Sequence, residues 1–284
     1  MSNQTIIPVF LDWTGTINEI LFTEKEIGAV KLKRFFDSIK NLENKTNSKA
    51  IITVVSGSSL SSSKSRLNII NQLAINYGMS DLFQFMVAEY SGYLIESNGT
   101  VTKLDSISSE LLYKQDEIKK FLENIQDIKI NTDVTTYINI IFSNQVPEEV
   151  YNEYTEKIRE QCGNTFDFLA SFDEYGKEFD IKSKSLTKKN AVSHMIPIIL
   201  NKYKGYNIPF ILAGGDTEKE DFQMSLADTG GIKIIPISPS NNDISKDIID
   251  RFNVIVGKGD NIDGISDSID RVSEFGGHRY IWKN

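Results

Sequence analysis

Five residues of this chain have the types and positions that phosphoryl transfer needs. Each lies directly after an apolar run or at the start of a helical pattern: Asp12, Ser56, Lys188, Asp216 and Asp221. A carboxylate can act as a nucleophile that forms an aspartyl-phosphate, and Mg²⁺ prefers oxygen ligands from a few carboxylates and a substrate phosphate. Lysine and serine side chains neutralise and hydrogen-bond phosphate oxygens. Together these residues predict a Mg²⁺-dependent site that acts on a phosphorylated substrate.

Such a site forms only if the chain brings these residues to one place. Short apolar runs predict buried strands at Ile6–Leu11, Ala50–Val55 and Pro209–Ala213. Apolar residues at helical spacing predict helices between them, at Glu24–Asn44 and Arg66–Tyr77. The alternation of strand and helix predicts parallel βαβ units. Ligands of open α/β sheets bind at the carboxyl ends of the strands, where the polar residues listed above are expected to meet.

The middle of the chain has a different pattern. Two helical segments, Ser109–Ile125 and Pro147–Cys162, are each followed by a pair of short strand patterns. This doubled unit predicts a small α+β insertion of roughly 85 residues. After Thr187 the first pattern returns. The remaining predicted elements are strands at Phe85–Ala88, Val134–Phe142, Phe166–Ser171, Glu178–Lys182, Ile232–Ile237 and Asn253–Val256, a hairpin around Asn98-Gly99, and helices at Lys188–Tyr203, Glu218–Asp228 and Ile262–Phe275.

The composition of the chain excludes several kinds of site and argues against several classes of partner. The chain has 284 residues, a formal net charge of −8 and a single cysteine, Cys162. An intrachain disulfide and a thiolate metal cluster are therefore excluded. The acidic balance argues against binding to nucleic acid or to an anionic membrane, and no apolar window is long enough to predict a membrane helix. The first residues lack a basic segment typical of a signal peptide, so a cytoplasmic location is expected.

The candidate residues resemble the four motifs of the haloacid dehalogenase superfamily. Asp12-Trp13-Thr14-Gly15-Thr16 resembles the first motif, D-x-[DT]-G-T, and Ser56 after a hydrophobic strand resembles the second. Lys188 resembles the third, and Gly215-Asp216 with Asp221 resembles the fourth, G-D-x-x-x-x-D. The insertion lies where this superfamily places its type-2 cap, and its doubled pattern is similar to the smaller cap of sugar-phosphatase-like members. The resemblance implies an α/β fold, with a Rossmann-like parallel-sheet core at 1–96 and 185–284 and an α+β type-2 (C2B-like) cap at 97–184.

The resemblance also implies a role for each matching residue. Asp12 would be the nucleophile and a Mg²⁺ ligand, and Thr14 would offer the metal its backbone carbonyl. Thr16, Ser56 and Lys188 would bind the substrate phosphate together with backbone N–H groups near Gly15 and Gly57. Lys188 would stabilise developing negative charge. Asp216 would bind the metal directly, and Asp221 would bind it directly or through water.

Two positions depart from the resemblance. Thr14 lies where phosphatases of this superfamily usually carry the Asp that acts as general acid and base. Such catalysis is typically worth about 10²–10⁴-fold, and a threonine hydroxyl does not replace it. Ser58 stands where an arginine often follows the glycine of the second motif. The leading hypothesis is a phosphatase that acts on a sugar phosphate. Three alternatives remain beside it: a phosphatase with slow hydrolysis, a phosphotransferase or mutase, and a weakly active phosphate-binding protein.

Each candidate also has a structural interpretation or a competitor. Asp12 lies at a strand end shortly before Gly15, where an Asp is most often an ordinary turn or cap residue. Ser56 can cap the following helix. Lys189 competes with Lys188 for the third motif, although the spacing to Ala191 favours Lys188. Glu220 competes with Asp221 as the last metal ligand.

Overall fold

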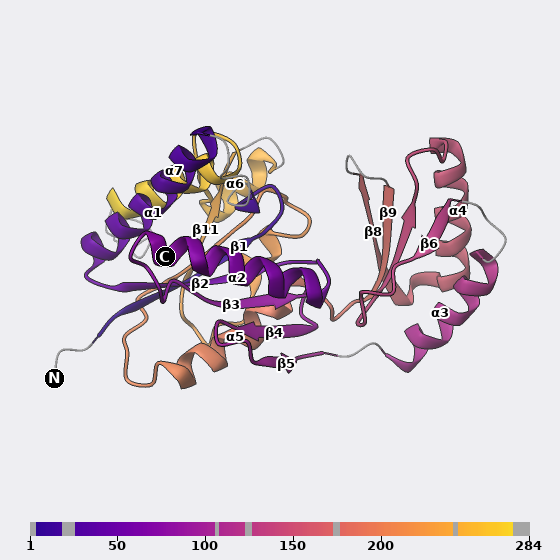
Figure 1. Cartoon of the computed structure of the whole chain (residues 1–284), viewed down its shortest axis with the longest axis horizontal. Helices are drawn as coiled ribbons and strands as arrows, with labels where there is room; N and C mark the ends of the chain where they lie inside the picture. The colour runs from indigo at the N-terminus through magenta and orange to yellow at the C-terminus, as the bar shows by residue number, and fades with distance from the viewer. Residues whose placement is uncertain are drawn as a thin grey trace.

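The computed structural model describes residues 4–18, 26–105, 108–122, 127–172, 177–240 and 244–274. Two sheets lie in separate parts of the molecule (Figure 1). The larger one is built from segments at both ends of the chain, and the smaller one from the middle of the chain. This division matches the change of pattern along the sequence.

The large sheet has eight strands within the described residues. Their order is β12 (Ile255–Val256), β11 (Ile234–Ser238), β10 (Ile211–Gly214), β1 (Ile6–Asp12), β2 (Lys49–Val55), β3 (Phe83–Ala88), β4 (Tyr93–Glu96) and β5 (Val101–Lys103). Neighbours from β12 to β3 are parallel, and β4 and β5 add an antiparallel edge. Every residue of the central strand β1 is buried, as a strand covered on both faces of a parallel sheet requires.

Helices cover both faces of this sheet (Figure 1). On one face, Phe35 and Ile265 pack with Leu11 of β1 in one hydrophobic cluster, and on the other face Ala191 packs with Phe10. None of the helices in the described ranges is long and apolar enough to cross a membrane. The first face is covered by α1 (Glu26–Thr46), α2 (Leu60–Asn76) and α7 (Asn261–Glu274), the second by α5 (Lys188–Lys202) and the 3₁₀ helix η3 (Phe222–Leu226), and α6 (Lys246–Phe252) precedes β12.

The small sheet is antiparallel and amphipathic. Apolar side chains such as Ile140 and Phe179 form a cluster with Ile118 and Ile158 of two covering helices. These helices lie on the side of the sheet away from the large sheet (Figure 1). The unit contains α3 (Ser109–Leu122), β6 (Ile128–Ile130), β7 (Ile138–Phe142), α4 (Glu148–Cys162), the 3₁₀ helix η2 (Gly163–Thr165), β8 (Phe166–Phe172) and β9 (Lys177–Ser183), with the strand order β6-β7-β9-β8.

The observed fold confirms the predicted α/β class with an inserted α+β unit. The helix predicted at Glu218–Asp228 is wrong: only the five residues of η3 are helical there. The Asp221 side chain accepts hydrogen bonds from the backbone N–H and hydroxyl of Thr217, which forms a tight loop in place of a helical turn.

Other boundaries shift by a few residues. Helix α2 begins at Leu60, six residues before the predicted Arg66–Tyr77, because Ser59 caps it by accepting from the Ser62 N–H. Strand β7 is shorter than the predicted Val134–Phe142. The predicted ends of two helices, at 123–125 and at Phe275, lie outside the described residues, as do the first two residues of Glu24–Asn44.

Candidate active site

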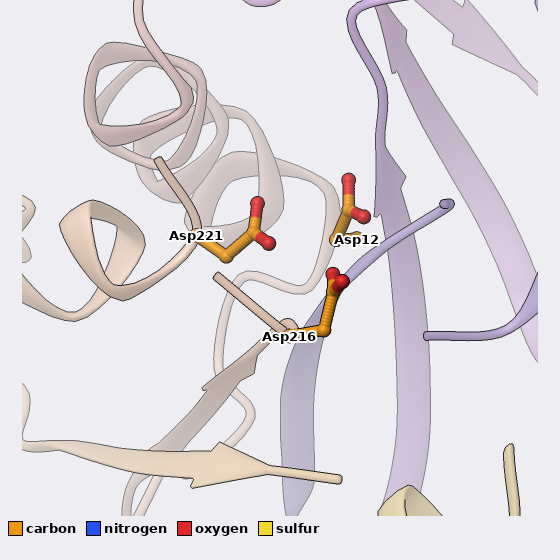
Figure 2. A group of neighbouring side chains, drawn as sticks. All are labelled: Asp12, Asp216 and Asp221. Atoms are coloured by element: carbon orange, nitrogen blue, oxygen red, sulfur yellow. The ribbon is translucent and has the colours of Figure 1, made fainter. Parts of the chain in front are cut away.

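Three carboxylates converge at the carboxyl end of the large sheet. Asp12 ends β1, Asp216 follows β10, and Asp221 directly precedes η3. One carboxylate oxygen from each lies within 4.8 Å of the others, and Figure 2 shows the three side chains gathered around one point. Asp12 and Asp221 are buried, whereas Asp216 is half-buried. This cluster is a group of hard oxygen donors of the kind that binds Mg²⁺.

The strand register and two glycines explain this convergence. Leu11 of β1 pairs with Gly214 of β10, so the residues that follow both strands leave the sheet at the same edge. A Cβ atom on Gly15 would lie 2.1 Å from Oδ2 of Asp216, and one on Gly215 would lie 2.3 Å from the Cβ of Asp221. Gly15 also has a φ of +69°, which favours glycine. Any larger side chain at either position would push the carboxylates apart.

Lys188 places its ammonium group among these carboxylates. It is the first residue of α5, and the Thr187 hydroxyl caps this helix by accepting from the Asn190 N–H. Its Nζ lies 2.6 Å from Oδ1 of Asp12 and also donates to Oδ1 of Asp221. Burial opposes the charged form of Lys188, but the two carboxylates outweigh it and raise the pKa of the ammonium above its usual value. Lys188 is therefore charged at neutral pH.

The carboxylates still carry more negative charge than the lysine neutralises. Burial and the Asp221 carboxylate raise the pKa of Asp216 to about 7, and the same two causes raise the pKa of Asp12 well above its ordinary value. When all three carboxylates are ionised, they and the ammonium leave two negative charges, the number that one Mg²⁺ neutralises. The donor set and this charge fit a divalent cation.

The predicted phosphate-binding residues surround the same edge. Ser56 is buried after β2, and its Oγ accepts the Ser58 N–H at 3.1 Å. The carbonyl of Gly57 accepts from the Tyr137 hydroxyl at 2.9 Å. Thr16 is buried, and its Oγ1 has no hydrogen-bond partner in the part of the chain that the structure describes. An orphaned buried hydroxyl calls for a ligand or water. Thr14, in contrast, is exposed.

Arg66 lies beside the position where the second motif lacks its arginine. This residue of α2 donates from Nη1 to the Ser58 hydroxyl, and its guanidinium carbon lies 5.1 Å from the centroid of the Trp13 ring. Burial lowers the pKa of Arg66, while the Asp12 carboxylate opposes this shift. The contact joins α2 to the loop after β1. No motif in the sequence identifies Arg66, because its contact with Ser58 forms only once α2 has folded.

The inserted unit contacts the core through two residues in a strained turn after β3. Glu89 and Tyr90 both have positive φ values, 52° and 64°, a conformation that costs energy for residues other than glycine. Glu89 is fully buried, and its Oε2 accepts from the backbone N–H groups of Thr135 and Thr136 at 2.9 Å. The Tyr90 hydroxyl donates to Oδ2 of Asp180 at 2.8 Å.

A second contact between the units involves Lys182 and Glu220. Lys182 lies on β9, its Nζ is 2.6 Å from Oε1 of Glu220 and 3.7 Å from the centroid of the Tyr90 ring. Glu220 and Asp221 compete as the last metal ligand. Asp221 lies in the carboxylate cluster, whereas Glu220 pairs with Lys182 of the inserted unit. Of the two competing lysines, Lys188 contacts Asp12, and Lys189 lines a neighbouring cavity.

No protein-family model and no curated protein matches the sequence. A haloacid dehalogenase-like hydrolase from Bacteroides thetaiotaomicron aligns with a TM-score of 0.59 at 13% identity, covering 94% of this chain and 100% of that chain. The C-terminal domain of trehalose-6-phosphate phosphatase from C. albicans gives 0.53 at 14%, covering 96% and 93%. The sucrose-phosphatase of Synechocystis sp., solved with sucrose and phosphate, gives 0.50 at 12%, covering 96% and 98%.

Proposed function

We propose that this chain, which has the fold of the haloacid dehalogenase superfamily, is a phosphatase that hydrolyses a small phosphorylated metabolite, in the class of sugar phosphates. The observation that carries the proposal is the convergence of Lys188 with the carboxylates of Asp12, Asp216 and Asp221. The similar structures include a trehalose-6-phosphate phosphatase and a sucrose-phosphatase. Their fold is shared over nearly the whole chain, which supports the proposed substrate class.

In this proposal Asp12 is the nucleophile. An oxygen of its carboxylate forms a bond to phosphorus, and the bond between phosphorus and the leaving oxygen of the metabolite breaks. Water then attacks the phosphorus of the aspartyl-phosphate, which frees inorganic phosphate and restores the carboxylate. Lys188, held 2.6 Å from Asp12, stabilises the negative charge that develops on the phosphoryl oxygens. Thr16, Ser56 and the N–H groups near Gly57 bind the same oxygens.

The carboxylates would hold Mg²⁺ together with the backbone carbonyl of Thr14. The bound ion would supply positive charge that lets an anionic phosphate approach an anionic nucleophile. The chain contributes the geometry for this, because Gly15 and Gly215 allow Asp216 and Asp221 to approach Asp12. Asp221 is held by the Thr217 N–H and hydroxyl at 3.0 Å and 2.9 Å, which fixes its carboxylate before any ligand binds.

The domain division proposed from the sequence assigns substrate selection to a cap at 97–184 that covers a core at 1–96 and 185–284. Support comes from contacts between the inserted unit and the carboxyl end of the large sheet, called here the catalytic edge. Tyr137 donates to Gly57, and Lys182 pairs with Glu220. Within this segment, Val101–Lys103 pairs with β4 of the large sheet. Closure of such a unit excludes water from the reacting groups and completes the site.

The test is Mg²⁺-dependent release of phosphate from a panel of sugar phosphates and p-nitrophenyl phosphate. The proposal expects release that depends on added Mg²⁺ and disappears in Asp12→Asn. Transfer of phosphate to an acceptor sugar in preference to water would replace the phosphatase by a phosphotransferase. Absence of release and of transfer across the panel, from a folded protein, would reject the proposal.

A further inference from the structure

The small sheet turns a polar face toward the large sheet. On β9, apolar Phe179 and Ile181 alternate with Asp180 and Lys182, and side chains of alternate residues lie on opposite faces of a strand. The apolar set packs against its own helices. The polar set contacts the other unit, since Asp180 bonds to Tyr90 and Lys182 to Glu220. The polar face is therefore a wall of the space above the catalytic edge.

A cavity of about 520 Å³ lies at this place, a volume typical of small-molecule sites. Its lining joins β8 and β9 of the small sheet to the start of α5 and to the loop after β10. It adjoins the catalytic cluster, because Lys188 both lines the cavity and contacts Asp12. Five of the lining residues are lysines, in a chain of net charge −8: Lys182, Lys184, Lys188, Lys189 and Lys219.

Two of these lysines are neutralised inside the protein. Lys188 pairs with Asp12 and Asp221, and Lys182 pairs with Glu220.

The other three lysines of the lining, Lys184, Lys189 and Lys219, have no ion pair among the described residues. The one lining carboxylate not yet counted is Asp167, which opposes Lys182 across the β8–β9 pair. With Lys182 and Lys188 set aside as paired, three lysines and one carboxylate of the lining remain, which is an excess of two positive charges. A wall built for a neutral sugar would not need this excess, whereas an anionic group would be attracted by it.

We propose that this cavity binds a second anionic group of the substrate. The substrate class would then be small metabolites that carry a carboxylate or a second phosphate beside the phosphoryl group removed at Asp12, such as phosphorylated sugar acids and bisphosphates. Lys184, Lys189 and Lys219 are the specificity-determining residues. The inference rests on the proposed function, since it places the transferred phosphoryl group at Asp12 and the second anion across Lys188 from it.

A matched pair of ligands tests the inference. 3-Phosphoglycerate and glycerol 3-phosphate have the same carbon number and the same phosphate, but only the first has a carboxylate. Their binding to Asp12→Asn in the presence of Mg²⁺ is measured by titration calorimetry, and their kcat/KM is measured on the wild type. We expect 3-phosphoglycerate to be favoured about tenfold or more in both, the gain of one hydrogen bond to a charged group. Fructose 1,6-bisphosphate against fructose 6-phosphate repeats the comparison with a second phosphate.

Substitutions of the lining lysines test whether the preference for the more anionic ligand arises in the cavity. In Lys184→Ala/Lys219→Ala the preference for the more anionic ligand of each pair should fall toward one. Lys204→Ala is the control, because this exposed lysine follows the C-terminal end of α5, and the helix from Lys188 to Lys202 is about 21 Å long. It should retain the full preference.

The outcomes separate the two proposals. Equal binding and equal kcat/KM within both pairs, with hydrolysis intact, would overturn the anion cavity and leave the phosphatase. A binding preference that is lost in the double variant, without hydrolysis of any substrate, would support the cavity and reject the phosphatase. A preference that survives in the double variant would overturn the assignment to these lysines.

Discussion

Glu89 of the large-sheet unit holds Thr136 of the inserted unit by two hydrogen bonds. Its Oε2 accepts from the Thr136 N–H at 2.9 Å and from the Thr136 hydroxyl at 2.8 Å. Its other oxygen, Oε1, accepts from the Leu60 N–H at the start of α2, 3.3 Å away. One buried carboxylate therefore connects the helix after Ser56 to the segment that leads into β7. The strained backbone of Glu89 aims this side chain between the two units.

Glu89→Ala should destabilise the protein because it leaves buried donors without an acceptor. A cost of about 1–3 kcal/mol in the free energy of unfolding is expected, measured by urea denaturation. Glu160→Ala, which changes an exposed glutamate of α4, should stay within about 0.5 kcal/mol of the wild type. If the two variants were equally stable, the hydrogen bonds of Glu89 would not contribute to the free energy of unfolding.

Thr14→Asp should raise the turnover of sugar phosphates. A sugar alkoxide needs a proton to leave, and the new carboxyl group would stand where resembling phosphatases carry their general acid; the gain is at most about 10²–10⁴-fold. Position 14 is exposed, so the added carboxylate does not have to be buried. The measurement is kcat on a sugar phosphate and on p-nitrophenyl phosphate, whose leaving group needs no proton and should gain less. A folded, Mg²⁺-binding variant that is slower on the sugar phosphate would show that Thr14 is suited to another mechanism.

Asp216→Asn should increase the Mg²⁺ concentration needed for half-maximal activity. The substitution removes one anionic oxygen ligand from the cluster. It also removes a carboxylate whose pKa is raised to about 7 by burial and by Asp221, so the metal-free protein should not lose stability. A Mg²⁺ titration of phosphate release, with thermal unfolding in EDTA as the control, checks both statements. An unchanged titration curve would place the metal elsewhere.

Asp180 should make the protein less stable as the pH rises. Burial raises its pKa to about 6 from an ordinary value of 3.8, although hydrogen bonds from Asn139 and Tyr90 oppose the shift. The native state therefore holds this proton more tightly than the unfolded chain, and stability is lost between about pH 4 and 6. Asp180→Asn removes this loss, so its unfolding free energy relative to the wild type should rise across that window by at most about 3 kcal/mol. A difference independent of pH would contradict the burial of an ionised Asp180.

Residues that follow strands could be predicted from the sequence, and residues placed by tertiary contacts could not. Asp12 and Ser56 end apolar runs, and parallel strands bring such ends together whatever the details of the fold. Arg66 and Glu89 reach the site only because a helix and a positive-φ turn return them to it. Glu220 and Asp221 are neighbours in the sequence, so the choice between them needed the Thr217 contacts that turn Asp221 inward.

The sequence predicted the strand at Glu178–Lys182 but not the surface that its polar side chains contact. That contact depends on how the two units pack. The predicted helix at Glu218–Asp228 failed for a related reason. Its residues have helical propensity, but the Asp221 side chain accepts hydrogen bonds from Thr217 and fixes the start of the segment in a loop.

The central claim is that Asp12 forms a covalent bond to phosphorus. The most direct test is a rapid acid quench of the wild type during turnover of a ³²P-labelled sugar phosphate, followed by mass spectrometry of the peptide that contains Asp12. The account predicts label on Asp12 that is lost on hydroxylamine treatment and absent from Asp12→Asn, whose fold and thermal unfolding are retained. Phosphate release by an Asp12→Asn protein at more than about a tenth of the wild-type rate, or label on another residue, would contradict it.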